Sequence, residues 1–539
     1  EDKFFSGSHA KLYGILSIKE FFVSLNGKTG MLLKLAEKDS SLSRLQYAKQ
    51  ILSFCIPLLS SIQQFYDIDD SKLKLREISD ETMNLGVEVC YELYRITREI
   101  KYAADAFLFS ETKRNSVLNE STKNKTAMFE AQVPDSIKNL ESSLRQKLKW
   151  LFISSADNLS EENENKTLNR ENLIRTTVRS YKTLINSLKQ NYPKYASLLA
   201  AGKILSPDEL ERGISKDAFL AEYTITENNI FIFCITNNSF TLVKTNKSRS
   251  FDNWNYSYRN SIKKIDKDTY NASAKELYRE LVTPIEKELS GKRKLIVIPC
   301  PELSALPFEA FISSKGIPLV QNFSIQYCGS SNEFIKESRV VTKKYPYYFI
   351  GFAPSYNNLQ KFAPLENQEE INEISKEIKN VGLQNILCSG PNATKQKFFD
   401  LTGKSRILHI AAHSFADTIN EGSSGIVFDS LLTGSEIITR EINNDLIVLS
   451  SCEGGNGKTA GGEGILSLAR NFLKAGAGNM LVSLWKVPDK QTKLFMTEFY
   501  RQLIKDNNYA EALSRTKRKV IEDKLYAFPN TWAAFVLLK

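Results

Sequence analysis

Histidine is scarce in this sequence, with only three in 539 residues. The three are His9, His409 and His413, so any chemistry that needs an imidazole has three candidates. A metal site built from several histidines is nearly excluded on this count. We therefore expect neither a metal nor a cofactor.

Cysteine pairing is also missing. The seven cysteines are odd in number, lie far apart along the chain and never form a C-x-x-C pair, which argues against a disulfide framework and against a zinc knuckle. A reducing compartment suits such a chain best, so we expect a cytoplasmic protein. The cysteines are Cys55, Cys90, Cys234, Cys300, Cys328, Cys388 and Cys452.

Long apolar runs and blocks of like charge are absent too. The longest apolar runs, such as NIFIFCI and AAFVLL, are far shorter than the ~18 residues of a membrane span, and the first thirty residues lack a signal-peptide pattern. The 72 basic and 62 acidic residues are interspersed, as on a mixed solvated surface, although a net charge of +10 permits an acidic partner or nucleic acid. Because the chain begins at Glu1 without methionine, we expect residues upstream of it.

The first part of the chain has helical periodicity. Apolar residues recur at helical spacing from about residue 40 to residue 190, and the polar segment 157–169 separates the last two helices, which we expect to form an antiparallel hairpin. Helix pairs at a spacing of roughly 35–40 residues suggest tetratricopeptide-like repeats, with a non-repetitive helical bundle as the alternative. We predict a repeat region over 1–150 and a hairpin and linker over 151–218.

From Phe219 the periodicity changes. Two or three alternating strands are followed by apolar strands that alternate with helices, for example YYFIGFA, RILHIAAHS, DLIVLSSC and NMLVSLW. Strands of this kind, buried on both faces, are typical of a mostly parallel sheet covered by helices. The sequence therefore predicts an α/β domain after an all-α domain.

Two of the apolar runs end in reactive side chains. RILHIAAH ends at His413, and DLIVLSSC ends 39 residues later at Cys452. Functional groups collect beyond the carboxyl ends of parallel strands, and a crossover of this length lets the two strands be neighbours. A nearby imidazole can deprotonate a thiol and then protonate a leaving amine. We predict a catalytic pair, against the alternatives of a buried core thiol and a merely hydrogen-bonded histidine.

Two further features surround this pair. Glycines after Cys452 let the backbone approach a substrate, and the N–H groups of Cys452 and Ser414 are candidates for an oxyanion hole. His409 lies four residues before His413, on the same face of the strand but deeper in the sheet. We interpret His409 as a packed structural histidine.

The glycine-rich segment SSCEGGNGKTAGGEG also resembles the end of a phosphate-binding loop, through Gly457, Lys458 and Thr459. The full G-x-x-x-x-G-K-[ST] pattern requires a glycine five residues before Gly457, and that position is Cys452. The loop must also run directly into a helix, whereas here further glycines delay the helix to about Glu463. We therefore expect no direct nucleotide binding.

These segments resemble the CHAT family of caspase-like cysteine peptidases, relatives of separase and caspases. The resemblance rests on ILHIAAHS, on IVLSSCEGGNG and the residues that follow it to Thr492, and on the terminal TWAAFVLL. LIVIPCPELSALPFEAF resembles the catalytically empty first half of the domain, and YAADAFLFSETKRNSVL resembles the last tetratricopeptide repeat before it. The resemblance implies an empty half over 219–345, a catalytic half over 346–539 and a dyad of Cys452 and His413. Ser414 stands where the family usually has glycine.

For function, the resemblance implies a regulated cysteine endopeptidase that cleaves one or a few partner proteins. The helical repeats would bind an activating protein or a protein–RNA complex, as in bacterial defence systems with gasdermin-like proteins or RNA-guided effectors. The alternative is a catalytically inactive scaffold for protein–protein interaction.

The substrate site follows from the same analogy. The strand VSLW, with Ser483 and Trp485, should lie beside the cleft and pair with the substrate backbone. An aromatic wall at Trp485 favours an apolar P1 residue, whereas three acidic residues are candidates for recognising a basic one, and the sequence leaves both open. The acidic candidates are Asp429, Glu453 and Glu463.

Overall fold

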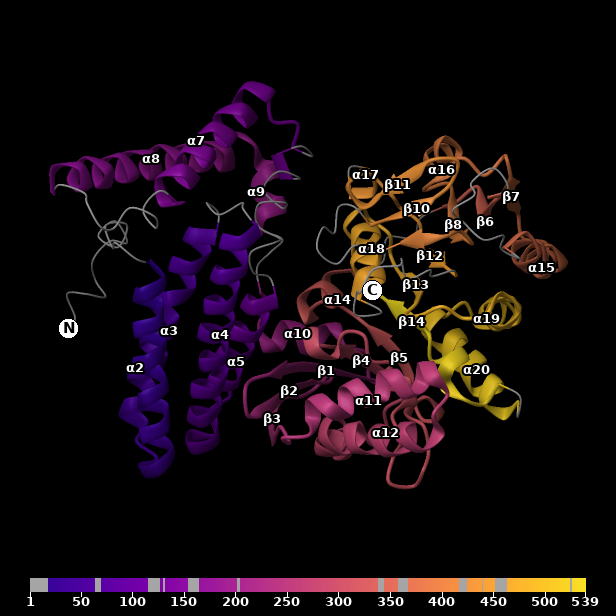
Figure 1. Cartoon of the computed structure of the whole chain (residues 1–539), viewed down its shortest axis with the longest axis horizontal. Helices are drawn as coiled ribbons and strands as arrows, with labels where there is room; N and C mark the ends of the chain where they lie inside the picture. Colours follow the sequence, from indigo (N-terminus) through magenta and orange to yellow (C-terminus); the bar gives the residue numbers. More distant parts are fainter. Residues whose placement is uncertain are drawn as a thin grey trace. The chain divides into compact units, whose positions relative to one another are not determined.

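The structure is a computed structural model of the chain, and it divides into two compact units, Glu1–Pro207 and Asp208–Lys539 (Figure 1). The structure describes residues 18–63, 69–114, 127–128, 131–153, 164–200, 204–337, 344–356, 367–415, 424–438, 440–450, 463–523 and 526–539.

All regular secondary structure in the described residues of the N-terminal unit is helical. The first four helices that the structure describes pack on their neighbours in sequence, with α2 also against α4 (Figure 1). Helix α4 buries Met83, Val87, Cys90 and Leu93, whose spacing of three and four residues places them on one face. The helices are α2 (Ile18–Asp39), α3 (Leu42–Gln63), α4 (Asp69–Thr97) and α5 (Ile100–Arg114).

A helical hairpin follows in the same unit. Helices α7 (Asp135–Ile153) and α8 (Glu164–Asn191) pack through Leu148, Leu151, Val178 and Tyr181, and a short helix α9 (Pro193–Ala200) comes after them. The Tyr181 hydroxyl donates a 2.9 Å hydrogen bond to Glu141 Oε1 across the hairpin. Position 151, where the sequence analysis places a boundary, lies inside α7, so the hairpin begins earlier, at Asp135.

Replacing either of two glycines of this unit with alanine should have opposite effects on its stability. A Cβ at Gly86 of α4 would overlap the ring of Phe109 in α5, whereas a Cβ at Gly27 of α2 would meet no atom within 4 Å. We expect Gly86→Ala to lower the free energy of unfolding of this unit by about 1–3 kcal/mol through overpacking. We expect Gly27→Ala to raise it by about 0.5–1 kcal/mol, because alanine favours a helix interior. Urea unfolding followed by circular dichroism checks both, and equal effects would contradict the α4–α5 packing.

The C-terminal unit is built on one mixed sheet, mostly parallel, with the strand order β3-β2-β1-β4-β5-β14-β13-β12-β8-β6-β7. The predicted α/β domain after an all-α domain is therefore confirmed. Strands β9, β10 and β11 form a separate small antiparallel sheet. The strands are β1 (Ala218–Ile225), β2 (Asn229–Ile235), β3 (Phe240–Asn246), β4 (Lys294–Ile298), β5 (Ser324–Tyr327), β6 (Tyr347–Pro354), β7 (Asn385–Gly390), β8 (Ser405–Ile410), β9 (Ser414–Phe415), β10 (Gly425–Val427), β11 (Leu431–Thr433), β12 (Leu446–Leu449), β13 (Met480–Ser483) and β14 (Phe535–Leu538).

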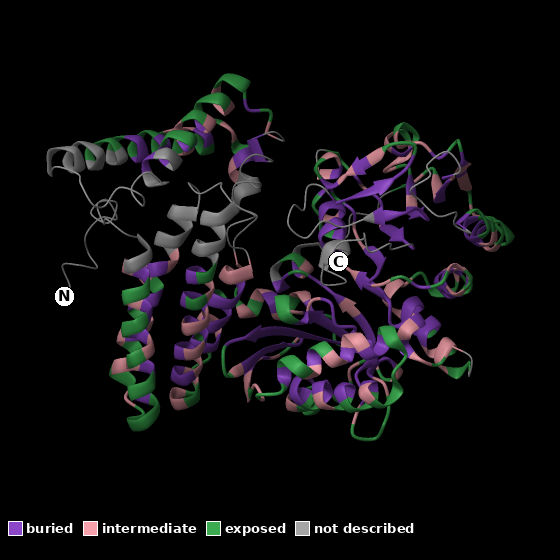
Figure 2. Cartoon of the chain, in the orientation of Figure 1, coloured by how far each residue is buried: buried purple, intermediate pink, exposed green. Residues whose placement is uncertain are grey.

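Helices cover the sheet. All residues of β12 and β13 are buried, which requires cover on both faces, and Figure 2 shows helices with one buried and one exposed side around a buried sheet. Thr394 caps α16 by accepting from Lys397 N, as expected for an N-cap threonine. The helices are α10 (Pro207–Gly213), α11 (Phe251–Lys264), α12 (Lys267–Leu281), α13 (Glu286–Leu289), α14 (Ser331–Glu337), α15 (Asn367–Asn380), α16 (Lys395–Leu401), α17 (Gly434–Ile438), α18 (Glu463–Lys474), α19 (Asp489–Asp506), α20 (Tyr509–Glu522) and α21 (Pro529–Trp532).

Strand β14 joins the two predicted halves of this unit. It runs parallel to β5, with Leu538 opposite Tyr327, and antiparallel to β13, with Phe535 opposite Ser483. One apolar core extends through both halves, from Phe219 to residues of β14. The halves are therefore parts of one sheet. Within the described residues, no helix is both long enough and apolar enough to cross a membrane.

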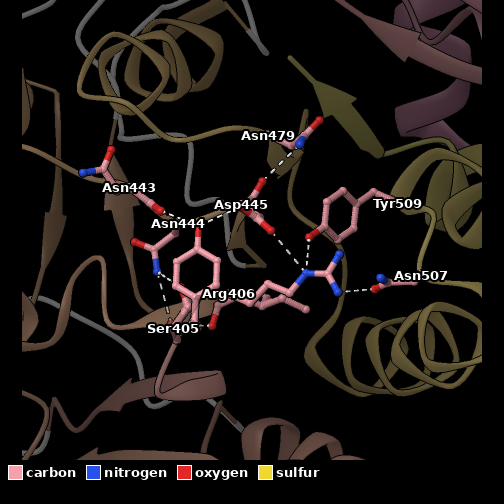
Figure 3. A network of polar contacts seen from close by, with 10 residues as sticks. Ser405, Arg406, Asn443, Asn444, Asp445, Asn479, Asn507 and Tyr509 are labelled. Atoms are coloured by element: carbon pink, nitrogen blue, oxygen red, sulfur yellow. Dashed lines mark hydrogen bonds and ion pairs between the residues drawn. The ribbon is translucent and has the colours of Figure 1, made fainter. Parts of the chain in front are cut away.

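A polar network fixes the amino ends of β8, β12 and β13 (Figure 3). At its centre, Arg406 Nε lies 3.3 Å from Asp445 Oδ2 and donates a 3.1 Å bond to Tyr509 Oη. Asp445 also accepts a 2.7 Å bond from the Tyr345 hydroxyl, and Asn479 donates a 3.0 Å bond to the Asp445 carbonyl. These contacts hold the edge of the sheet opposite to the one where His413 lies.

Candidate functional site

The candidate site begins where β8 and β12 end. The two strands are parallel neighbours, as the sequence predicts, and their last register pair joins Ile410 and Leu449. Beyond that pair, Ser450 N donates a 3.3 Å bond to the Ile410 carbonyl. His413 is the third residue after Ile410, and Cys452 is the third residue after Leu449. Cys452 itself lies outside the described residues.

The backbone of His413 is hydrogen-bonded through both its carbonyl and its N–H group. Its side chain is buried, with 1% of the residue exposed. Its carbonyl accepts a 2.8 Å bond from Val427 N of β10, and its N–H donates a 2.9 Å bond to Tyr356 Oη. The Tyr356 ring also packs on the imidazole, with 4.5 Å between centroids and 55° between planes. The main chain at His413 is therefore fixed by partners from two other segments.

His409 is packed in the structure and completely buried, in agreement with its interpretation as a structural residue. Its Nδ1 lies 3.0 Å from Tyr500 Oη, and its Nε2 lies 2.9 Å from Glu370 Oε1 and 3.2 Å from Ser450 Oγ. Burial raises the pKa of Tyr500 well above its usual value, so its hydroxyl keeps a proton to donate. A neutral imidazole that accepts at Nδ1 and donates from Nε2 to the carboxylate satisfies these contacts.

These contacts connect four elements beneath the site. His409 belongs to β8, Glu370 to α15 and Tyr500 to α19, while Ser450 directly follows β12. Because buried polar networks with satisfied partners rigidify their surroundings, the ends of β8 and β12 are held in a fixed relation.

Ser414, a predicted oxyanion residue, is the first residue of β9 and lies opposite Ile426 of β10. The bond from Val427 N to the His413 carbonyl makes residues 413 and 427 a hydrogen-bonded pair, so the next pair, 414 and 426, is of the non-bonded type. The Ser414 N–H therefore points to the side of β9 away from β10.

The strand VSLW, predicted to pair with substrate, begins between two other strands of the sheet. Val482 lies opposite Leu449 of β12 on one side and Val536 of β14 on the other, and Leu484 N donates a 2.8 Å bond to the Ala534 carbonyl. From Val482 to Leu484 the side of this strand that faces β14 is therefore already paired, and substrate pairing by VSLW stays a prediction.

Ser483 and Trp485 also form hydrogen bonds with the backbone of the same unit. The Ser483 hydroxyl donates a 2.7 Å bond to the Trp485 carbonyl, and the indole N–H of Trp485 donates a 2.7 Å bond to the Asn530 carbonyl. Ser483 is buried, and the partly buried Trp485 packs on the main core. Trp485 stays a prediction as a pocket wall, with its polar edge already bonded.

The three acidic candidates have different outcomes. Asp429 lies between β10 and β11, where its Oδ1 accepts a 2.7 Å bond from Lys395 N, the first residue of α16. Its carboxylate thus accepts a hydrogen bond from a backbone N–H of the first turn of α16. Glu463 is the first residue of α18, but its side chain lies outside the described part, as does all of Glu453.

Sequence reasoning missed Tyr356, Glu370 and Tyr500. Tyr356 follows the end of β6 by two residues, so the rule that drew attention to His413 and Cys452 also applies to it. Glu370 and Tyr500 lie inside amphipathic helices, where nothing marks them as buried partners of a histidine. Within the described residues, no group of three or more His, Cys, Asp or Glu side chains is arranged to hold a metal ion.

Comparison with known proteins gives one family match and several distant similarities. The CHAT domain family model matches residues 271–539. Tetratricopeptide repeat protein 28 of Homo sapiens is 35% identical over 108 residues, which are 20% of this chain and 4% of that protein. The Saccharomyces cerevisiae separase–securin complex is similar at 10% identity and a TM-score of 0.40, over 96% of this chain and 49% of that one. The complex of Porphyromonas gingivalis RgpB pro- and mature domains is similar at 11% identity and a TM-score of 0.33, over 54% of this chain and 74% of that one.

Proposed function

Because residues 271–539 are a CHAT domain, we propose that this protein is a cysteine endopeptidase with Cys452 as nucleophile and His413 as general base. The register of β8 and β12 carries the proposal. Each of the two residues is the third after the pair Ile410 and Leu449 of two parallel neighbouring strands, so we expect both at the same edge of the sheet.

The chemistry follows from the two groups. The His413 imidazole takes the thiol proton of Cys452, and the thiolate attacks the carbonyl carbon of the scissile peptide bond. The oxyanion that forms would be stabilised by N–H groups, for which Ser414 and Cys452 are the candidates. The imidazolium then protonates the leaving amine, and water hydrolyses the thioester with His413 again as base.

The proposed substrates are one or a few partner proteins, and the N-terminal helical unit is the proposed regulator. A unit made of packed helix pairs offers a surface for a protein or protein–RNA activator. No cofactor and no nucleotide take part in this scheme. We place the enzyme in the cytoplasm, where reduced thiols keep Cys452 available.

The test compares the wild type with Cys452→Ala and His413→Ala. Each purified protein is incubated with a cell lysate, and new protein N-termini are mapped by mass spectrometry. We expect cleavage by the wild type and a loss of at least ~100-fold in both variants, because general-base catalysis alone contributes ~10²–10⁴-fold. The matched control is Cys328→Ala, which removes another buried thiol and should leave cleavage intact.

Labelling with iodoacetamide provides a second readout that needs no substrate. Cys452 should react faster than the other cysteines, of which all six are buried. Cleavage that persists in Cys452→Ala would rule out the proposed nucleophile. A wild type that neither cleaves nor reacts preferentially at Cys452 would instead support a catalytically inactive scaffold.

A further inference from the structure

The small sheet beside the candidate site has an irregular ladder at His413. In an antiparallel ladder, a hydrogen-bonded pair exchanges two N–H···O=C bonds. Residues 413 and 427 occupy such a position, one step beyond the pair of Ser414 and Ile426. The first bond, from Val427 N to the His413 carbonyl, is present at 2.8 Å.

The second bond of that pair is replaced by a tyrosine hydroxyl. The N–H of His413 donates to Tyr356 Oη at 2.9 Å, and the same hydroxyl donates to the Val427 carbonyl at 2.9 Å. The hydroxyl oxygen thus stands between the two backbone groups that would otherwise bond directly. The three residues form a closed ring of hydrogen bonds.

This arrangement determines where the histidine backbone lies. A direct bond would bring the His413 nitrogen to ~2.9 Å from the Val427 oxygen, whereas the inserted hydroxyl keeps the two atoms apart by two successive bonds. The position of the His413 nitrogen relative to Val427 therefore depends on the Tyr356 hydroxyl. Tyr356 is buried, with 4% exposed, so solvent does not compete for its hydroxyl.

The tyrosine ring adds a second constraint on the same residue. It packs at 4.5 Å from the imidazole and inclined to it by 55°, so it restricts the rotation of the His413 side chain. Backbone and side chain of His413 are thus set by one residue that comes from the end of β6.

We propose that Tyr356 is a positioning residue that holds His413 in the orientation needed to accept the proton of Cys452. The proposal rests on the proposed function of the Cys452–His413 pair. Tyr356 touches neither substrate nor the reacting sulfur in this scheme. It acts through the geometry of His413.

The consequence is specific to the hydroxyl. In Tyr356→Phe the ring stays, and the freed His413 N–H and Val427 C=O can bond directly, since the hydroxyl oxygen no longer lies between them. The fold should survive this change, with a melting temperature within a few degrees of the wild type. The histidine, however, would turn with its backbone, and misplacement of a catalytic group by about 1 Å can cost roughly 100-fold in rate.

The experiment is alkylation of Cys452 by iodoacetamide in the full chain, with rates measured by mass spectrometry from pH 5 to pH 9. In this reaction the sulfur bonds to the acetamide carbon and iodide leaves, and the thiol proton goes to His413 or to solvent. An unassisted thiol becomes reactive only near its ordinary pKa of ~8.5, whereas a thiol paired with an imidazole reacts at lower pH. The variants are His413→Ala, Tyr356→Phe and Tyr356→Met.

We expect the wild type at pH 6 to react at least roughly tenfold faster than His413→Ala, with both Tyr356 variants close to His413→Ala. At pH 9 all four proteins should converge, because the thiolate then forms without a base. Tyr356→Met fills the space of the ring without a hydroxyl and serves if the phenylalanine variant does not fold. The matched control is Tyr345→Phe, which removes a hydroxyl bonded to the Asn443 carbonyl at the opposite ends of the strands and should follow the wild type.

The outcomes separate the two proposals. If the wild type and His413→Ala react alike at pH 6, the proposed dyad fails. If they differ but Tyr356→Phe follows the wild type, the dyad stands and the positioning role of Tyr356 is overturned. If Tyr345→Phe falls as far as Tyr356→Phe, the effect is a general loosening of the domain, which also overturns it.

Discussion

Replacing Lys517 with methionine is expected to lower the free energy of unfolding of the C-terminal unit by about 3–5 kcal/mol. Lys517 of α20 forms a 2.7 Å ion pair with Glu309, and both side chains are buried, with exposures of 0% and 1%. The other carboxylate oxygen of Glu309 accepts a bond from the Tyr327 hydroxyl. Removing the ammonium group leaves a buried carboxylate without its cation, which is the costly case.

The Lys517–Glu309 ion pair itself contributes less to the free energy of unfolding than the removal of one partner would cost. Burial lowers the pKa of Lys517, whereas the attraction of Glu309 raises it, so desolvation and pairing oppose each other. The double variant Lys517→Met/Glu309→Gln should therefore recover most of the stability, because a glutamine can still accept from Tyr327 without a charge. Urea unfolding of the three proteins measures these differences.

An exposed ion pair provides the control. Lys493 pairs with Glu369 at 2.8 Å, and the carboxylate is 66% exposed. Lys493→Met should cost no more than about 1 kcal/mol, as is typical of surface pairs. If Lys517→Met were equally mild, water must reach Glu309, and the continuous core between the two halves of the unit would be wrong at this point.

The sequence predicted the elements of the site well because they depend on local pattern. Apolar runs that end abruptly in polar residues identified β8 and β12, and a parallel sheet then required His413 and Cys452 at one edge. The start of α18 followed from the glycines before Glu463, which are a local signal as well.

What the sequence could not predict depends on contacts between distant residues. Tyr356 contacts His413 and Val427, which are 57 and 71 residues away, and its place after a strand does not indicate which residues it contacts. The buried partners of His409 belong to two helices whose apolar faces are ordinary. Their packing decides which polar residue turns inward.

The sheet neighbours of VSLW were not predicted for the same reason. The role of VSLW was proposed by analogy with caspases, and its four residues suit an edge strand as well as an interior one. The last strand of the chain pairs with it, and the register with β13, Val536 opposite Val482, is a pairing across more than fifty residues. A period of two residues fixes the face of a strand but leaves its neighbours open.

Replacing Phe535 with alanine is the second large prediction, and it tests how β14 joins the unit. Phe535 is fully buried, lies opposite Ser483 and stacks on Phe495 of α19, with 4.4 Å between centroids and 19° between planes. We expect a loss of about 3–5 kcal/mol in the free energy of unfolding, as for other buried phenylalanines. The matched control is Leu538→Ala in the same strand, where partial exposure should limit the loss to about 1–2 kcal/mol.

Hydrogen exchange followed by mass spectrometry shows which strands lose protection when Phe535 is replaced. Strands β4 and β12 belong to the two different halves, but they share one sheet and one apolar core through β5, β14 and β13. If the unit unfolds as one body, Phe535→Ala should speed the exchange of both strands by the same factor, since both then open only by global unfolding. Faster exchange in β12 with unchanged protection in β4 would mean that the halves unfold separately. In that case β14 would be a contact between two cores rather than part of one.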